Sequence, residues 1–329
     1  MSNKNLRDAK MAKNDEFFTQ YPDIQKEINA YLEYDPNVFK DKTILLPCDD
    51  PELSNFTKFF VQNFEKFGLK KLISTCYVNT KQIYLNNDCL QNFNSHGKIL
   101  VITKENLNSK WQYLKGDGDF RSSEIKALRD GSDFIITNPP FSLFREFVSW
   151  IFESDKKFLI VGSMNAVVCK KIFSLIKENK MWLGNGFSNG NAYFATPENN
   201  KKTNLVKFGN CWWYTNIAHG KRYKPLSLLT KADNLRFNKK LQKYQYAYKK
   251  YDNYDAIEIP LTEAIPSDYE GIMGVPISFL DKYCPEQFEI IDISSNLARP
   301  IIINGNRVTG IFYVNGKSLY KRIAIRKIK

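Results

Sequence analysis

A run of hydrophobic residues ends in four residues that suit the transfer of a group to an amine. Residues 133–137 (Asp-Phe-Ile-Ile-Thr) have the pattern of a buried strand, and Asn138, Pro139, Pro140 and Phe141 follow directly. The Asn138 amide oxygen and the Pro139 carbonyl oxygen can both accept hydrogen bonds from an exocyclic amine such as N6 of adenine. Phe141 can stack on the base, and the two prolines hold the acceptors in place. The motif predicts methylation of such an amine, and the alternative is a simple turn that ends the strand.

The chain around this motif alternates strand patterns with helical patterns, which is typical of an α/β domain with a largely parallel sheet. Strands are predicted at 43–47, 71–77, 99–103, 133–137 and 158–161, and helices at 51–67 and 142–153. In open sheets of this kind, the functional site lies at the carboxyl ends of the strands. Beyond residue 200 the pattern loosens into short strand candidates at 274–279 and 311–314, so we place a domain boundary near residue 200.

The net charge of +13 is concentrated in one segment. Residues 201–250 contain thirteen Lys or Arg and one acid, Asp233, so the rest of the chain carries only +1. The candidate phosphate-binding cations are Lys221, Arg222, Lys224, Arg236, Lys239, Lys240, Lys243, Lys249 and Lys250. A second basic cluster comprises Lys317, Lys321, Arg322, Arg326, Lys327 and Lys329.

Aromatic residues are interleaved with the lysines of the same segment. They are Trp212, Trp213, Tyr214, Tyr223, Phe237, Tyr244, Tyr246 and Tyr248. Disordered basic tails are normally poor in aromatic residues. Lysines that neutralise phosphates beside rings that stack on bases are typical of a nucleic-acid surface, which we predict here; a solvated basic loop is the alternative.

Other features exclude several classes of protein. No run of about 18 apolar residues could span a membrane, and the N-terminus lacks the apolar stretch of a secretion signal. The six cysteines form no Cys-x-x-Cys pair and there are only two histidines, so we expect neither a structural zinc site nor any other metal. We therefore expect a cytoplasmic protein with reduced thiols.

Several blocks of sequence resemble the EcoRI-type adenine-specific DNA methyltransferases. They are residues 15–21, 48–51 with 54–56, 116–122, 138–144, 251–257, 273–277 and 285–288. The resemblance implies an S-adenosylmethionine-dependent methyltransferase sheet, Rossmann-like, with helices on both faces and a smaller carboxy-terminal target-recognition region. It places the catalytic domain at residues 1–200 and target recognition at 201–329.

The same resemblance assigns cofactor contacts. Residues implied to bind S-adenosylmethionine are Phe17, Phe18, Thr19, Cys48, Asp49, Asp50, Pro51, Thr75, Cys76, Asp119, Phe120 and Asn138. Asp49 or Asp50 would accept a hydrogen bond from the methionine ammonium, although two acids before a helix also form an ordinary N-cap. Asp119 would accept from the amino group of the cofactor adenine and Phe120 would cover its ring, with a solvated turn as the alternative.

Two departures from the family pattern limit these assignments. The Gly-x-Gly of methyltransferase first loops is replaced by Asp50-Pro51, and no acid follows residues 73–77, where relatives bind the ribose hydroxyls. Thr75, Cys76 or Tyr77 would serve there instead.

The activity implied is site-specific N6-methylation of an adenine flipped out of double-stranded DNA, in a restriction-modification, orphan or phage modification system. Arg121 or the basic segment would hold phosphates. We expect a monomer, and a restriction endonuclease acting on the same site without a stable complex is a compatible partner. The alternatives are an RNA-adenine or protein-amide methyltransferase and a non-catalytic DNA-binding protein on the same fold.

Overall fold

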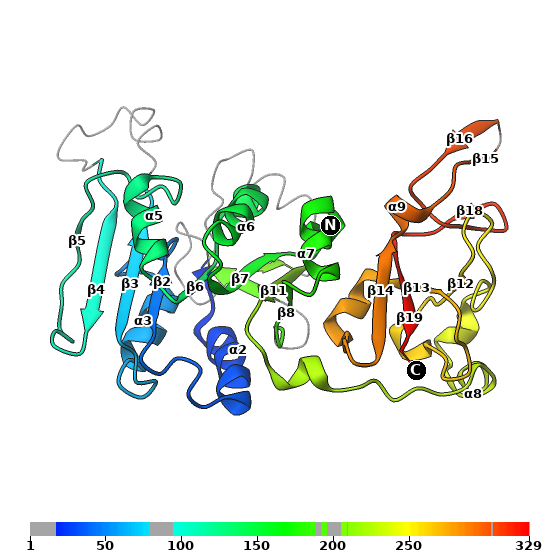
Figure 1. The fold of residues 1–329 in the computed structure, drawn as a ribbon, viewed down its shortest axis with the longest axis horizontal. Coiled ribbons are helices and arrows are strands. Elements are labelled where there is room, and N and C mark those ends of the chain that lie inside the picture. Colours follow the sequence, from blue (N-terminus) through cyan, green and yellow to red (C-terminus); the bar gives the residue numbers. More distant parts are fainter. Residues whose placement is uncertain are drawn as a thin grey trace. The chain divides into compact units, whose positions relative to one another are not determined.

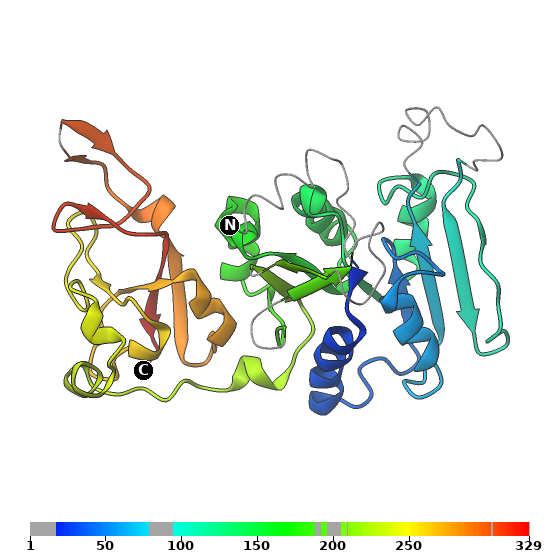
Figure 2. The same cartoon turned by 180° about the vertical axis from the view of Figure 1, so that it is seen from behind.

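The computed structural model describes residues 18–78, 95–187, 192–195, 205–208, 210–303 and 305–328, and these form two compact units (Figures 1 and 2). The first unit comprises residues 1–166 and 183–219, and the second comprises residues 167–182 and 220–329. No helix in the described ranges is long and apolar enough to cross a membrane.

The first unit is built on an eight-stranded sheet in the order β5-β4-β3-β2-β6-β7-β11-β8. Its strands are β2 (Thr43–Leu46), β3 (Lys71–Cys76), β4 (Lys98–Thr103), β5 (Gln112–Tyr113), β6 (Phe134–Thr137), β7 (Lys157–Ser163), β8 (Trp182–Leu183) and β11 (Cys211–Thr215). A small second sheet joins β1 (Phe18–Thr19), β9 (Ala192–Ala195) and β10 (Val206–Phe208).

Parallel pairing joins the four central strands of the large sheet. β3, β2, β6 and β7 run in one direction, whereas β4 is antiparallel to β3 and β11 is antiparallel to β7. The prediction of a largely parallel sheet is therefore wrong at the edges, and the sheet is mixed. The sequence could not have indicated this, because a pattern of buried side chains does not encode the direction of a strand.

Helices cover both faces of this sheet, as Figure 1 shows. The helices are α2 (Tyr21–Tyr34), α3 (Asn55–Gln62), α5 (Ser123–Asp130) and α6 (Phe144–Phe152), with 3-10 turns η1 (Phe141–Leu143) and η2 (Met164–Val168). Ile44 and Leu46 of β2 belong to the hydrophobic cluster of α2 and α3, while Leu45, between them, is equally buried. Strands that are buried on both faces read as continuous hydrophobic runs, which explains why they were found from the sequence.

The helix predicted to begin at Pro51 begins four residues later. The Asp50 carboxylate accepts hydrogen bonds from the backbone N–H groups of Glu52 and Leu53, which closes a turn. Ser54 then caps α3 by accepting from Phe56 N at 3.0 Å. Two other elements also differ from expectation. The region 142–153 begins with η1 before α6. Of the predicted strand 274–279, only residues 274–276 belong to a strand, which starts at residue 273.

The second unit has a four-stranded sheet in the order β12-β13-β19-β14. Its strands are β12 (Ile257–Glu258), β13 (Met273–Pro276), β14 (Phe288–Ile293) and β19 (Arg322–Lys327), and two hairpins pair β15 (Ile301–Ile303) with β16 (Asn306–Val308) and β17 (Tyr313–Val314) with β18 (Lys317–Ser318). Its helices are α7 (Lys170–Lys177), α8 (Lys231–Phe237) and α9 (Ser294–Leu297), with 3-10 turns η4 (Gly220–Tyr223), η5 (Leu241–Lys243), η6 (Thr262–Ala264) and η7 (Ile277–Lys282).

Two residues of the basic, aromatic segment lie in the core of the first unit. β11 pairs with β7, and Trp213 and Tyr214 are only 1% and 0% exposed. The prediction that their rings face a nucleic acid is wrong. Cys-Trp-Trp-Tyr-Thr forms a strand because β-branched and aromatic side chains suit the two covered faces of a sheet.

Arg322, which we had assigned to the second basic cluster, is also buried. Its guanidinium donates three hydrogen bonds to the Glu258 carboxylate at 2.7–3.1 Å, and the Tyr251 hydroxyl donates a fourth at 2.5 Å. Glu258 is 1% exposed. This ion pair therefore links β19 to β12 across the intervening strand β13, and Arg322 is not available to a ligand.

Removing one partner of this buried pair should destabilise the protein strongly. We expect Arg322→Met to lower the free energy of unfolding by about 3 kcal/mol, because it leaves the Glu258 carboxylate desolvated without its cation. Urea unfolding followed by circular dichroism measures the change. Arg326→Met, at an exposed position near the end of the same strand, is the control and should change it by less than about 0.5 kcal/mol. Equal effects of the two substitutions would contradict this account.

Candidate active site

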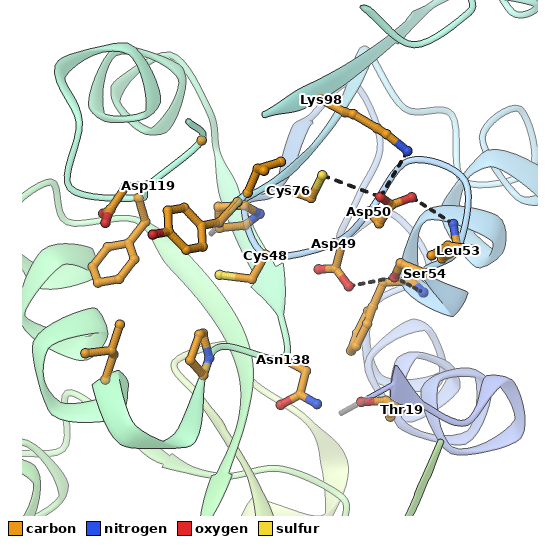
Figure 3. Close-up of a pocket in the computed structure, with 18 of the residues that line it drawn as sticks. Thr19, Cys48, Asp49, Asp50, Leu53, Ser54, Cys76, Lys98, Asp119 and Asn138 are labelled. Atoms are coloured by element: carbon orange, nitrogen blue, oxygen red, sulfur yellow. Dashed lines mark hydrogen bonds and ion pairs between the residues drawn. The ribbon is translucent and has the colours of Figure 1, made fainter. Parts of the chain in front are cut away.

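A cavity of about 340 Å³ opens in the first unit where β2, β3 and β6 end (Figure 3). This is the edge at which parallel strands of an α/β sheet place their functional residues. The predicted site residues that line it are Thr19, Cys48, Asp49, Asp50, Cys76, Asp119, Phe120, Arg121, Asn138 and Pro140. The tertiary fold therefore brings together residues that are up to 121 positions apart in the sequence.

Several other predicted residues do not line this cavity. Thr75 is buried and its hydroxyl donates to Pro47 O at 3.3 Å. Phe141 is 8% exposed and packs edge-on against Phe194, with ring centroids 6.2 Å apart. Pro51 and Pro139 are absent from the cavity wall. Phe17 lies outside the described residues, and only the backbone of Phe18 is described.

Asp49 is the most buried acid of the cavity. Its carboxylate accepts hydrogen bonds of 2.6 Å from Ser54 Oγ, at the start of α3, and from Thr137 Oγ1, at the end of β6. Its backbone N–H donates to Thr75 O at 2.8 Å, and its carbonyl accepts from Ser74 Oγ at 2.6 Å. Burial raises the pKa of Asp49 to about 7, although both side-chain hydrogen bonds act in the opposite direction.

Asp50 is held by a different set of partners. Besides the two N–H groups that fix its turn, its carboxylate lies 3.4 Å from Lys98 Nζ and 3.5 Å from Cys76 Sγ. Burial, reinforced by the Asp50 charge, raises the pKa of the Cys76 thiol to about 12, so the thiol remains protonated at neutral pH. Cys76 can therefore donate a hydrogen bond but cannot act as a nucleophile.

Lys98 lines the cavity and was not found from the sequence. It lies at the start of β4, where its ammonium also contacts Glu52 at 2.5 Å and sits 4.7 Å from the centre of the Trp111 ring. A single lysine before a strand carries no distinguishing signal, because solvated lysines are common there. Ser54 and Thr137 were missed as site residues for the same reason, since capping and strand-end hydroxyls are frequent.

Asp119 and Arg121 form a bidentate pair on another wall of the cavity. Arg121 Nη2 and Nε lie 2.5 Å and 2.9 Å from the Asp119 carboxylate oxygens, and the Arg121 N–H donates to the same carboxylate at 2.8 Å. These hydrogen bonds hold the pKa of Asp119 below its usual value. Phe120, between them, is 5% exposed and packs against Phe147 and Trp150, so only part of its ring borders the cavity.

Gly118 gives the same wall its shape. Its φ is +86°, and a Cβ at this position would lie 2.2 Å from the carbonyl oxygen of Cys76. A larger residue would therefore be strained and would push this loop away from the end of β3. The glycine sits in the Gly-Asp-Gly-Asp block that carries part of the family resemblance.

Thr19 contributes a polar atom whose hydrogen-bonding capacity is not used within the described part of the chain. Its side chain is 2% exposed and lines the cavity, yet its hydroxyl contacts no donor or acceptor there. The Thr19 carbonyl accepts from Asn55 Nδ2 at 2.8 Å, which ties β1 to α3. Because a buried hydroxyl without a partner is costly, Thr19 marks a place where a ligand group can bind.

The candidate phosphate-binding cations lie in the second unit and fall into three groups. Lys221 contacts Asp281 at 2.6 Å. Arg222 is 4% exposed, with its guanidinium 3.8 Å from the centre of the Trp182 ring, so it acts in packing. The exposed cations are Lys224, Arg236, Lys239, Lys240, Lys243, Lys249 and Lys250, of which Lys250 lies 3.5 Å from Asp255.

These features define a class of enzyme. Acids and a hydroxyl that can bind a cationic ligand face the same cavity as an amide that can accept hydrogen bonds from an amine, at the carboxyl edge of an α/β sheet. Such a site suits group transfer to nitrogen.

Comparison with known proteins identifies the family. A family model described as the adenine-specific methyltransferase EcoRI matches residues 5–328. The type II methyltransferase M.EcoRI of Escherichia coli is 40% identical over 342 residues, covering 99% of this chain and 97% of the relative. The type II methyltransferases M.MpnI of Mycoplasma pneumoniae and M.MgeORF184P of Mycoplasma genitalium are each 34% identical, covering 97% of both chains. No solved structure gives a significant match.

The chain belongs to the EcoRI family of adenine-specific methyltransferases. The resemblance inferred from the sequence blocks is therefore confirmed, and the protein is an enzyme.

The raised pKa of Asp49 makes a prediction about stability. Between pH 4 and 7 the folded protein keeps a proton that the unfolded chain releases, so the free energy of unfolding should fall as the pH rises through this range and then level off. The shift of the Asp49 pKa from 3.8 to about 7 corresponds to a decrease of about 4 kcal/mol at most in the free energy of unfolding.

Because an asparagine at position 49 does not titrate, Asp49→Asn should lack this decline in the free energy of unfolding. Urea unfolding of both proteins at pH 5 and pH 8 tests the difference, because other titrating groups affect both alike. Parallel pH profiles would contradict the assignment.

Proposed function

We propose that this enzyme transfers a methyl group from S-adenosylmethionine to N6 of an adenine flipped out of duplex DNA, as the modification enzyme of a type II restriction-modification system or an orphan modification system. The observation that carries the proposal is the position of Asn138. It follows β6 directly and lines the same cavity as Asp49, Asp119 and Thr19. An amine acceptor and a cofactor can therefore meet in one space.

The first unit has the properties of a Rossmann-like methyltransferase domain, and we assign cofactor binding and catalysis to it. Four parallel strands are covered on both faces, and the cavity lies at their carboxyl ends. The second unit, which holds the exposed cations, is assigned to DNA binding and target recognition.

The cavity residues fit S-adenosylmethionine. Asp49 and Asp50 supply carboxylate oxygens for the methionine ammonium, and Thr19 Oγ1 supplies a buried hydroxyl for the same end of the molecule. Asp119 can accept from the adenine amino group while Phe120 borders the ring, and Gly118 leaves the space open. The cofactor supplies an electrophilic methyl group when bound. A volume of about 340 Å³ is within the range of small-molecule sites.

The Asn138 motif orients the acceptor amine. The Asn138 oxygen and the adjacent proline carbonyl accept the two N6–H groups, which directs the nitrogen lone pair toward the incoming methyl group. Pro140 has φ of −54°, the value its ring imposes, so the turn needs no reordering during the reaction. Because an amide is not basic, the proton that N6 loses passes to solvent and not to Asn138. Flipping the adenine out of the duplex costs a few kcal/mol, which DNA binding must offset.

Replacing Asn138 should separate catalysis from binding. We expect Asn138→Ala to lower kcat by about 100-fold or more, with little change in DNA affinity, because the amide acts on the reacting amine. Incubation with unmethylated genomic DNA and S-adenosylmethionine, followed by nucleoside mass spectrometry, measures N6-methyladenine. Ser142→Ala, an exposed neighbour, is the control. Near-normal turnover of Asn138→Ala would rule out this role, and methylation of RNA or protein but not DNA would rule out the proposed substrate.

The exposed lysines predict how binding depends on salt. The triple substitution of Lys239, Lys240 and Lys243 by Gln should weaken binding to all DNA sequences and make the slope of log affinity against log salt shallower by up to about 3. Fluorescence anisotropy over a range of salt concentrations measures both. Gln at Lys66, Lys70 and Lys110 removes the same charge from exposed positions of the first unit and should have a smaller effect. Equal effects of the two triple substitutions would contradict a surface centred on the second unit.

A further inference from the structure

The hairpin β15–β16 of the second unit is a ribbon that pairs with no other strand in the described part of the chain. Figures 1 and 2 both show it projecting away from the four-stranded sheet of that unit. Its register places Ile302 opposite Arg307, and Ile303 opposite Asn306. Because directly opposed residues share a face of a ribbon, Ile302 and Arg307 form one face and Ile303 and Asn306 the other.

The face formed by Ile302 and Arg307 is the more exposed of the two. Ile302 is 74% exposed and Arg307 is exposed, whereas Ile303 is half-buried. Because an isoleucine stabilises a fold mainly through burial of its side chain, Ile302 contributes little to folding. An apolar side chain beside a guanidinium, both directed to solvent on a narrow ribbon, is suited to contact with a partner.

The base of the ribbon is held by Asn253, which is 3% exposed. Its amide donates to the carbonyls of Arg299 at 3.1 Å and Ile311 at 2.9 Å, one residue on each side of the hairpin. Its oxygen accepts from Tyr313 N at 3.1 Å. A single buried side chain therefore fixes where the ribbon leaves the unit and where the chain returns.

The second hairpin is anchored by the neighbouring residue. The Asp252 carboxylate accepts from the N–H groups of Asn315 and Gly316 in the β17–β18 turn at 3.1 Å and 2.8 Å. Tyr254 stacks on Phe312, with ring centroids 5.1 Å apart and planes inclined by 8°. The block at residues 251–257, singled out by family resemblance, therefore positions both hairpins.

The chemistry of the ribbon matches the edges of DNA bases. A two-stranded ribbon fits the major groove, where arginine donates two hydrogen bonds to O6 and N7 of guanine and apolar side chains contact the thymine methyl group. A phosphate would use Arg307 but would leave Ile302 without a partner. Exposed cations at Arg299 and Lys317 flank the hairpins and can bind the adjacent backbone.

We propose that the β15–β16 ribbon reads the target sequence in the major groove, with Arg307 recognising a guanine and Ile302 contacting the methyl group of a neighbouring thymine. This inference rests on the proposed function, because it assigns specificity within the same reaction. Arg307 and Ile302 are specificity residues and lie outside the proposed methyl-transfer site.

The test maps methylated adenines, strand by strand, in unmethylated genomic DNA treated with each full-length variant. Arg307→Lys keeps the positive charge but cannot form the paired hydrogen bonds to guanine, and Arg307→Ala removes both the charge and the hydrogen bonds. Ile302→Ala removes only the apolar contact. Arg326→Lys, an exposed arginine on β19, is the matched control. We expect both Arg307 variants to lose about 10-fold or more discrimination at one G·C position of the motif, and Ile302→Ala to lose less at an adjacent A·T position. The control should keep the wild-type motif.

Two results would overturn the proposal. The first is an unchanged motif in all three variants. The second is that Arg307→Ala weakens binding on every sequence, whereas Arg307→Lys keeps the wild-type motif and affinity. This second result would identify Arg307 as a phosphate contact. Thermal unfolding of each variant shows whether the fold is kept. A wild-type map without methylated adenine would overturn the proposed function itself and this inference with it, so the two failures are distinguishable.

Discussion

The buried carboxylate of Asp49 connects three elements on which the cavity depends. It accepts hydrogen bonds from the hydroxyl of Ser54, which caps α3, and from the hydroxyl of Thr137, which ends β6, while its backbone pairs with β3. Thr137 directly precedes Asn138, so the carboxylate that binds Thr137 also sets the position of the Asn138 amide, and both side chains line the same cavity. A desolvated acid in this place is unfavourable when ionised, and the two short hydrogen bonds offset part of that cost. The cavity is therefore organised around an acid that titrates near neutral pH.

Burial also decides which cations are available to DNA. Arg222 and Arg322 have the same side chain as Arg236, but they are 4% and 8% exposed and are held by an indole ring and by a carboxylate. Moving the Arg322 guanidinium to a phosphate would leave the Glu258 carboxylate uncompensated, which costs several kcal/mol. The lysines around η5 carry no such constraint, so their charges can act on a polyanion and can be screened by salt.

Much of the fold and site could be predicted, because the relevant signals are local. Hydrophobic runs located the five strands predicted in the first domain, although some ends shifted by one or two residues. The positions of Asn138, Asp49 and Asp119 after strands or in loops placed them at the cavity. Lys98 and Thr137 were missed because their roles come from contacts with residues distant in the chain: Asp50 for Lys98, and Asp49 for Thr137.

The sequence by itself determined the family, the strand pattern and the Asn-Pro-Pro-Phe motif, because these depend on residue type and spacing along one segment. The tertiary structure decided which residues of that pattern face the cavity. It packed Phe141 against Phe194, paired Lys98 with Asp50 and placed Trp213 in the core. It also decided that β4 and β11 run antiparallel to their neighbours. The physical reason is that burial, ion pairing and strand direction depend on partners brought together only by folding, and no local pattern specifies them.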